Sequence, residues 1–147
     1  IDSFEAIQML HDNGFCHGDI RNDHIVIDER TGKYRWIDFD LCQDFLGYDV
    51  CAIGNILQYV IGKGLNSYYE INKGGRFPAS TISSLDKSDA NAFYTYRIMN
   101  LKKLYPYISE QLSTILLRFS VGATENYATV SRIIQDLSEA IDEVPTN

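Results

Sequence analysis

The 147-residue sequence lacks the features that mark several large classes of protein. It has three cysteines, Cys16, Cys42 and Cys51, with no Cys-x-x-Cys pair and no even number for a disulfide framework. No apolar run approaches the roughly 18 residues of a membrane span, and no basic-then-apolar signal peptide opens the chain. These absences argue against a disulfide-stapled secreted domain, and they predict a cytoplasmic protein with reduced, buried thiols.

Positive charge is also scarce in this chain. Thirteen Lys and Arg residues stand against 20 Asp and Glu residues, which gives a formal net charge of −7. Such an acidic chain lacks the excess positive charge that binding to nucleic acid or to an anionic membrane requires, so neither is expected as a partner. Phosphate groups remain candidate ligands, provided that cations bridge them to the protein.

The composition is that of an ordinary globular protein. Hydrophobic residues make up 45% of the chain and charged residues 22%, both near the averages for folded domains. The length suits one domain with a substantial core, so we expect a single domain over residues 1–147. Ile1 is not a usual start and helical spacing begins almost at once, so we expect a piece of a longer protein.

Hydrophobic spacing predicts an α+β fold that is mostly helical, with a helix, a polar loop, a small β-hairpin and then about four helices. The expected helices cover residues 3–11, 49–61, 88–104, 109–120 and 129–142, and the expected strands cover residues 25–27 and 34–39. Residues 72–84 are rich in Gly, Ser, Thr and Asn and are predicted to form a loop or insertion. We expect His11 to be exposed near the end of the first helix.

The residues best suited to chemistry lie on either side of the predicted hairpin. Residues 17–24 read HGDIRNDH, and residues 37–40 read IDFD. A tight hairpin would let Asp19 and Asp38 approach each other. Phosphoryl transfer needs one carboxylate at the attacking hydroxyl, another on magnesium and a cation near the phosphate. Taken alone, these carboxylates could instead be a loop cap and a hairpin-end charge, and His24 a polar loop residue without a metal contact.

The order and spacing of these motifs resemble the protein kinase and aminoglycoside phosphotransferase superfamily. Its catalytic loop, H-R/G-D-x-K-x-x-N, is followed by a hairpin and by D-F-G. The stretch DVCAIGNIL at residues 49–57 resembles the D-x-W-S-x-G-x-x-L helix of protein kinases. The likeness runs from the helix before the loop to the last helix, and it implies a protein kinase-like C-terminal lobe (C-lobe).

The resemblance implies a role for four residues of the loop and its support. Asp19 would be the catalytic base. Arg21 stands where kinases place a lysine and would keep a positive charge near the transferred phosphate. His17 would brace the metal-binding turn, and Asp49 would tie down the backbone of the catalytic loop.

The resemblance also implies a magnesium site, with departures from the family pattern. Asp38 would be the principal magnesium ligand. His24 stands where the family has its metal-binding Asn, and a nitrogen ligand there weakens a second site or favours manganese. Asp40 replaces the Gly of D-F-G and adds a carboxylate that could supply the lost ligation.

The implied activity is ATP-dependent transfer of phosphate to a hydroxyl acceptor, with magnesium, and three alternatives remain open. The 49–57 helix favours a serine/threonine protein kinase-like enzyme, whereas the His-Gly-Asp loop and the short segment 41–48 favour a small-molecule kinase of the aminoglycoside or choline type. His24 and Asp40 motivate a pseudokinase-like binding module without efficient catalysis. Because the sequence has no Gly-rich loop and no strand lysine, a missing N-lobe would have to complete the site. We expect the isolated chain to be inactive.

Overall fold

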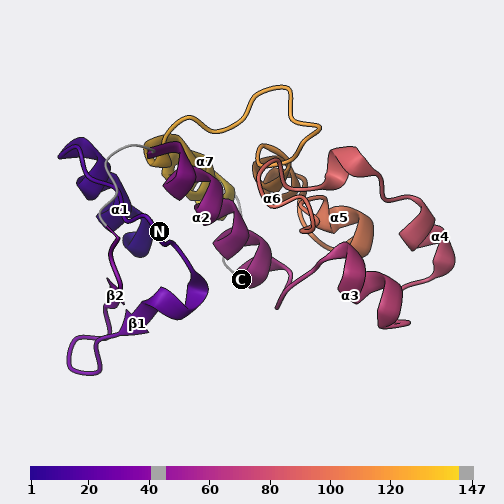
Figure 1. Ribbon diagram of the computed structural model, residues 1–147, viewed down its shortest axis with the longest axis horizontal. Helices are drawn as coiled ribbons and strands as arrows, with labels where there is room; N and C mark the ends of the chain where they lie inside the picture. Colours follow the sequence, from indigo (N-terminus) through magenta and orange to yellow (C-terminus); the bar gives the residue numbers. More distant parts are fainter. Residues whose placement is uncertain (41–45, 143–147) are drawn as a thin grey trace. The chain divides into compact units, whose positions relative to one another are not determined.

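The computed structural model describes residues 1–40 and 46–142 (Figure 1). Over these residues the fold is α+β, with seven α-helices, two short 3₁₀ helices and one two-stranded antiparallel sheet. The helices are α1 (Asp2–Asp12), α2 (Leu46–Ile61), α3 (Tyr68–Lys73), α4 (Ala79–Ser83), α5 (Leu101–Leu104), α6 (Glu110–Leu117) and α7 (Val130–Asp142), and the strands are β1 (Ile25–Ile27) and β2 (Tyr34–Trp36). None of the described helices has the length and hydrophobicity that crossing a membrane requires.

The described residues form two compact units, and the boundary between them falls within α2. The first unit contains the chain up to Ile56 together with the segment from Tyr127 onward, and the second is Leu57–Asn126. Chain length and composition gave no sign of this division. The single domain that they led us to expect over residues 1–147 stays a prediction.

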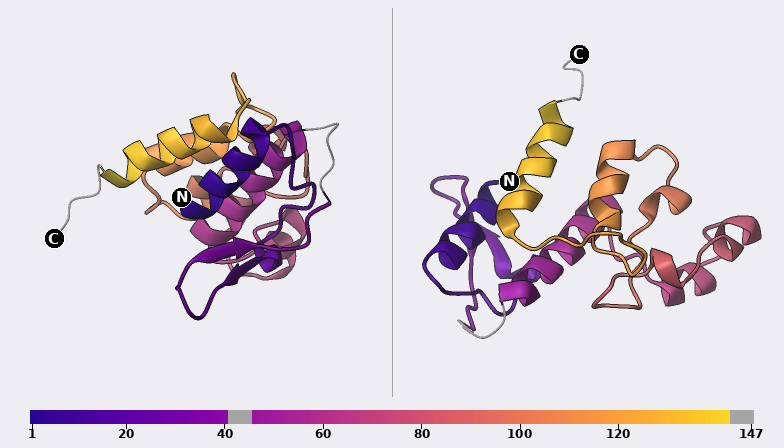
Figure 2. Two further views of the ribbon diagram at one scale, coloured as in Figure 1. Left: turned by 90° about the vertical axis from the view of Figure 1, so that its left-hand side faces the viewer. Right: turned by 90° about the horizontal axis from the view of Figure 1, so that it is seen from above.

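The core of the first unit forms where α1 packs against α7 and β2 (Figure 2). The side chains that fill it are apolar and recur at helical spacing: Phe4, Ile7, Val50, Ile53, Val130, Ile133 and Leu137. Burial of each such side chain stabilises the fold by roughly 1.5–3 kcal/mol. The sequence-based predictions of α1, α2 and α7 are confirmed, with ends that differ by one to three residues.

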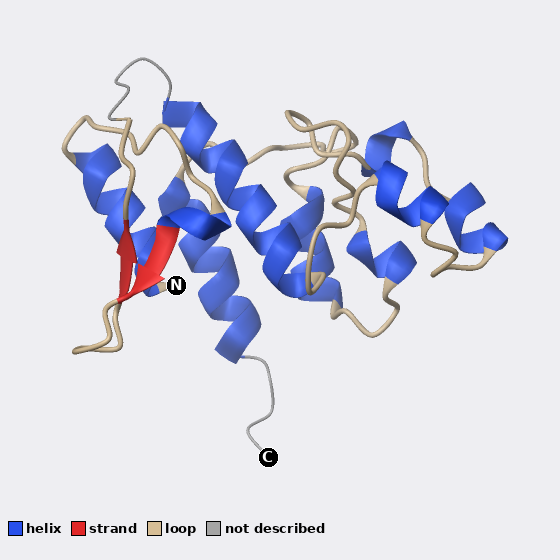
Figure 3. Ribbon diagram, turned by 60° about the horizontal axis from the view of Figure 1, so that its bottom comes forward, coloured by secondary structure: helices blue, strands red, loops and turns tan. Residues whose placement is uncertain are grey.

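The hairpin is the only sheet among the described residues and leads directly to the candidate site (Figure 3). Its register pairs Ile25 with Trp36 and Ile27 with Tyr34. The Trp36 indole N–H donates to the backbone carbonyl of Ser3 at 2.6 Å, which fastens the hairpin to α1. The prediction of β1 is confirmed. The prediction that the second strand reaches residue 39 is wrong, because Asp38 has a left-handed backbone (φ 57°) that cannot continue an extended strand.

The second unit is built around α3 to α6 and a buried polar network. The Gln58 side chain is fully buried and donates to the carbonyls of Asn66 and Ile98. The Asn66 side chain donates to two glycine carbonyls and accepts from the Tyr105 hydroxyl at 2.8 Å. Because each buried polar group has a partner, the network fixes the path of the chain without an unpaired donor or acceptor at these contacts.

Two predictions for the second unit are wrong. The helix expected over residues 88–104 is confined to α5, because the Asn91 side chain accepts the N–H groups of Phe93 and Tyr94 and replaces helical bonds with a turn. The loop expected over residues 72–84 contains the end of α3 and all of α4. Ser67 starts α3 by accepting the N–H of Glu70 as an N-cap.

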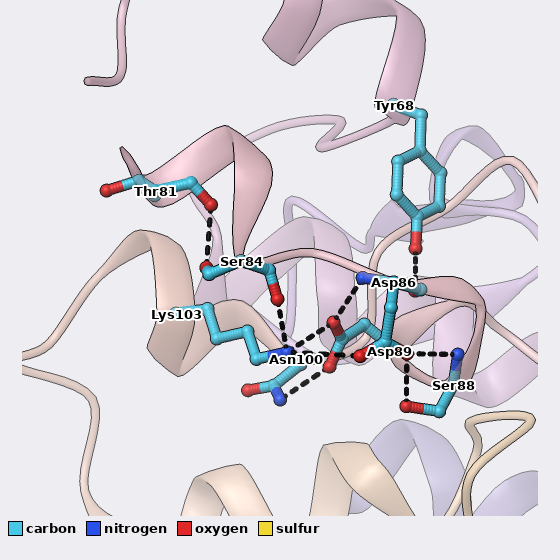
Figure 4. Close-up of polar contacts among 8 residues, drawn as sticks. All are labelled: Tyr68, Thr81, Ser84, Asp86, Ser88, Asp89, Asn100 and Lys103. Carbon is cyan, nitrogen blue, oxygen red and sulfur yellow. Dashed lines mark hydrogen bonds and ion pairs between the residues drawn. The ribbon is translucent and has the colours of Figure 1, made fainter. Parts of the chain in front are cut away.

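A second polar cluster lies around Asp89, which is 3% exposed (Figure 4). Its carboxylate accepts from the Lys103 ammonium at 2.6 Å, from the Asn100 side chain at 2.7 Å and from the Asp86 amide at 2.9 Å. The Lys103 ammonium also donates to the Ser84 carbonyl at 2.7 Å. One buried carboxylate therefore connects the 3₁₀ helix Lys87–Asp89, the segment before it and α5.

Candidate functional site

The loop after α1 is held in place by a single buried side chain. Asp49, in the first turn of α2, is 0% exposed, and its carboxylate accepts the N–H of His17 at 2.6 Å and that of Gly18 at 2.9 Å. Two successive amides can converge on one carboxylate because Gly18 adopts a positive φ of 82°, which a residue without a β-carbon takes readily. The resemblance to kinases led us to expect this backbone contact at Asp49.

His17 is fully buried behind this loop. Its ring lies 4.5 Å from that of Phe39 and 5.1 Å from that of Trp36, and its backbone carbonyl accepts the amide of Asp40 at 2.8 Å. Its Nδ1 accepts the Asp19 amide at 3.3 Å, so the same side chain supports the residue expected to be catalytic. His17 thus joins the loop to residues 39 and 40 beyond the hairpin.

Burial lowers the pKa of His17 below the ordinary value of 6.5 and outweighs the nearby Asp49 carboxylate and Ile37 carbonyl, which raise it. The folded protein therefore holds this imidazole neutral at pH values where the unfolded chain has begun to protonate it. Below about pH 6.5 the unfolded state binds more protons at this group, so its contribution to stability falls as the pH falls.

We predict that acid destabilises the protein partly through this residue. In urea titrations between about pH 7.5 and pH 5, the free energy of unfolding should fall less steeply for His17→Asn than for the original chain. Asparagine keeps an acceptor for the Asp19 amide but does not titrate. Gln8→Asn, which changes a half-buried side chain of α1 that does not titrate, provides a control that should leave the slope unchanged. Parallel slopes for His17→Asn and the original chain would contradict the prediction.

His24 lies between the two carboxylates that the sequence singled out. Its Nδ1 is 2.9 Å from the Asp19 carbonyl and 3.5 Å from the Asp19 carboxylate, and its Nε2 is 3.7 Å from the Asp38 carboxylate. Because a carbonyl oxygen only accepts, Nδ1 carries the proton in that hydrogen bond. The structure therefore brings Asp19, His24 and Asp38 together, with His24 buried and the Asp38 side chain 71% exposed.

Asp38 also adopts an unusual backbone. Its φ of 57° places it in the left-handed region, which costs a residue with a β-carbon roughly 1–2 kcal/mol, although Asp tolerates it better than most. Strained backbone of this kind is concentrated at functional sites. The turn at Asp38 is therefore one of the features that mark this part of the first unit as a candidate site.

Arg21 has a different ion-pair partner, and Asp40 joins the site through its backbone. The guanidinium of Arg21 makes a two-pronged ion pair with Asp23, at 3.0 and 2.7 Å, rather than with Asp19. This contact raises the pKa of Arg21 and lowers the pKa of Asp23. Asp40 is exposed, and its backbone amide connects it to the site by donating to the His17 carbonyl at 2.8 Å. The segment of residues 41–45, which includes Cys42, lies outside the described residues.

The donor chemistry of the cluster suits a divalent cation only in part. Over residues 1–40 and 46–142, no group of three His, Cys, Asp or Glu side chains is arranged to hold a metal ion. Magnesium in phosphoryl-transfer sites, however, is bound through one or two carboxylates together with substrate phosphates and water. Asp38 supplies an exposed carboxylate of this kind, which suits a cation that arrives with phosphate and water better than a resident ion.

Sequence reasoning missed one residue of this site. His11 was expected to be exposed, but its side chain is 9% exposed, and its Nε2 lies 3.0 Å from the Asp49 carboxylate. The two residues are 38 positions apart in the chain. The one local signal was its place in the last turn of α1, which says nothing about a partner in α2.

Comparison of the chain with known proteins leaves its class open. No family model matches it, and neither the curated proteins nor the solved structures contain a match.

Proposed function

We propose that this chain is the C-lobe of an ATP-dependent phosphotransferase of the protein kinase-like type. The observation that carries the proposal is the arrangement around Asp49, which holds the loop backbone while Asp19 and Asp38 flank His24. In this function Asp19 accepts the proton of the attacking hydroxyl, and Asp38 holds the magnesium that accompanies ATP. Arg21 would leave Asp23 to meet the phosphate.

The surface around the hairpin also supports the proposal. Apolar side chains are exposed on or next to β1 and β2: Val26, Ile27, Tyr34, Ile37 and Phe39. Exposed apolar side chains that gather on one element indicate an interaction surface. We propose that an N-lobe carrying the Gly-rich loop and the strand lysine covers this surface in a longer, cytoplasmic protein.

The test is phosphate transfer by the full-length protein. With ATP and either Mg²⁺ or Mn²⁺, turnover should be measured on two acceptor sets, Ser/Thr peptides and hydroxyl-bearing small molecules such as aminoglycosides and choline. Asp19→Asn should lower kcat by about a hundredfold or more, because it removes the general base and keeps the shape of the side chain. Asp12→Asn, on the exposed end of α1, is the matched control and should leave kcat unchanged. Equal turnover in Asp19→Asn and the original protein would refute the role of Asp19.

A binding module without efficient catalysis is the second candidate. Two observations favour it: Arg21 is occupied by Asp23, and the described residues hold no ready set of three metal ligands. Such a module would bind ATP without transferring its phosphate. Nucleotide binding with no turnover on either acceptor set, in the presence of both metals, would select this candidate.

A further inference from the structure

We propose that His11 is a positioning residue, which holds the Asp49 carboxylate and through it the backbone of the loop that carries Asp19. Its effect on the loop follows from the contacts alone, whereas any effect on turnover rests on the proposed function. His11 is not among the seven residues to which the resemblance to kinases assigns a role.

The contact joins three elements at one carboxylate. Oδ2 of Asp49 lies 3.0 Å from Nε2 of His11 and accepts the His17 amide at 2.6 Å, while Oδ1 accepts the Gly18 amide at 2.9 Å. His11 belongs to the last turn of α1 and Asp49 to the first turn of α2, so this one carboxylate connects both helices to the loop at His17 and Gly18.

Because the Asp49 carboxylate is fully buried, the hydrogen bond from His11 matters to it as much as those from the two amides. A fully buried carboxylate keeps its charge only when hydrogen-bond donors replace the water it has lost. Both oxygens of the Asp49 side chain already accept amide N–H groups, so we assign Nε2 of His11 as the donor in its contact with Oδ2. Without this donor the Asp49 carboxylate keeps its two amide partners and loses the contact that holds it from α1.

The geometry also explains how the effect reaches Asp19. The two amides bound by Asp49 directly precede the Asp19 amide, which donates to Nδ1 of His17. A change in the orientation of the Asp49 carboxylate therefore shifts the backbone of His17 and Gly18 first. Asp19 follows because it is the next residue in the chain.

Hydrogen exchange of single amides, measured by NMR on the full chain, tests this proposal. In His11→Leu, which keeps the bulk and removes the donor, the His17 and Gly18 amides should exchange at least about tenfold faster, because a hydrogen bond to a charged group is lost. His11→Gln places a side-chain N–H where Nε2 lies and should restore slow exchange. Unchanged exchange in His11→Leu would overturn the proposal. So would faster exchange throughout α1 that His11→Gln does not restore, since this indicates a role in helix packing alone.

A measurement on the unaltered chain covers the case in which His11→Leu fails to fold. At about pH 8, above the ordinary histidine pKa, the ¹⁵N shifts of the His11 ring should show the proton on Nε2. A proton on Nδ1 would overturn the proposal. In the full-length enzyme, His11→Leu should lower kcat with little change in KM for ATP, and His11→Gln should preserve both. Absence of turnover in the original protein would count against the proposed function alone, while the exchange rates still decide the role of His11.

Discussion

Asp89→Ala should destabilise the protein by roughly 3 kcal/mol, because it removes a buried carboxylate that accepts hydrogen bonds from three donors, one of them the part-exposed Lys103 ammonium. The substitution leaves the Lys103 ammonium and the Asn100 side chain without the acceptor that they share, and it also frees the Asp86 amide. Lys103 keeps the Ser84 carbonyl at 2.7 Å and the exposed Asp86 carboxylate at 3.7 Å, but neither replaces the buried acceptor. The measurement is the free energy of unfolding from urea titration, followed by the change in helical circular dichroism.

A nearby carboxylate provides the matched control. The side chain of Asp86 is 62% exposed and lies 3.7 Å from the same ammonium. It caps the 3₁₀ helix by accepting the Ser88 amide, so Asp86→Ala should cost only about 1 kcal/mol, the typical loss of an N-cap. Equal losses for the two substitutions would show that burial of Asp89 does not set the energy of this cluster.

Asp49→Ala should cost a similar amount, about 3–5 kcal/mol, by a different route. Three donors converge on this carboxylate, and its removal leaves the buried His17 amide and the part-buried Gly18 amide without their acceptor. A buried group left unsatisfied loses its full hydration, which costs roughly 1–3 kcal/mol for each one. We therefore expect lower stability together with rapid exchange of those amides.

Asp49→Asn separates the two contributions. The side-chain carbonyl oxygen of asparagine can still accept one of the two backbone N–H groups. Its NH₂ group is a donor, so it cannot accept the other. We expect a smaller loss of stability than for Asp49→Ala, and protection retained at only one of the two amides. An Asp49→Asn variant as stable as the original chain, with both amides protected, would show that the charge at this position has no part in holding the loop.

The extent to which the sequence predicted the structure depends on how local each interaction is. The strand at residues 25–27 and helix α7 were predicted because a β-branched run and a regular apolar spacing are local signals. The helix expected over residues 88–104 failed because one side chain, that of Asn91, captures amides that a helix would have used. Hydrophobic spacing does not report such competition.

The candidate site was predictable in composition and not in geometry. The spacing around a hairpin indicated that Asp19 and Asp38 could approach each other, and the resemblance to kinases implied the role of Asp49. That His24 lies between two of these carboxylates, and that Arg21 turns to Asp23, depends on side-chain orientation. The contact of His11 with Asp49 joins two helices that are far apart in the chain, so no local pattern could reveal it.

The position of Trp36 gives the first unit an intrinsic optical reporter. It is the one tryptophan in the sequence, it is 8% exposed, and its ring meets that of His17 edge-on at 5.1 Å. Indole emission responds to the polarity and charge of its surroundings. The wavelength and intensity of Trp36 emission therefore report on the buried region around His17. Residues 57–126 contribute no indole, and their unfolding is silent in this signal. Fluorescence and circular dichroism recorded on one sample therefore distinguish the loss of the first unit from the loss of helix elsewhere.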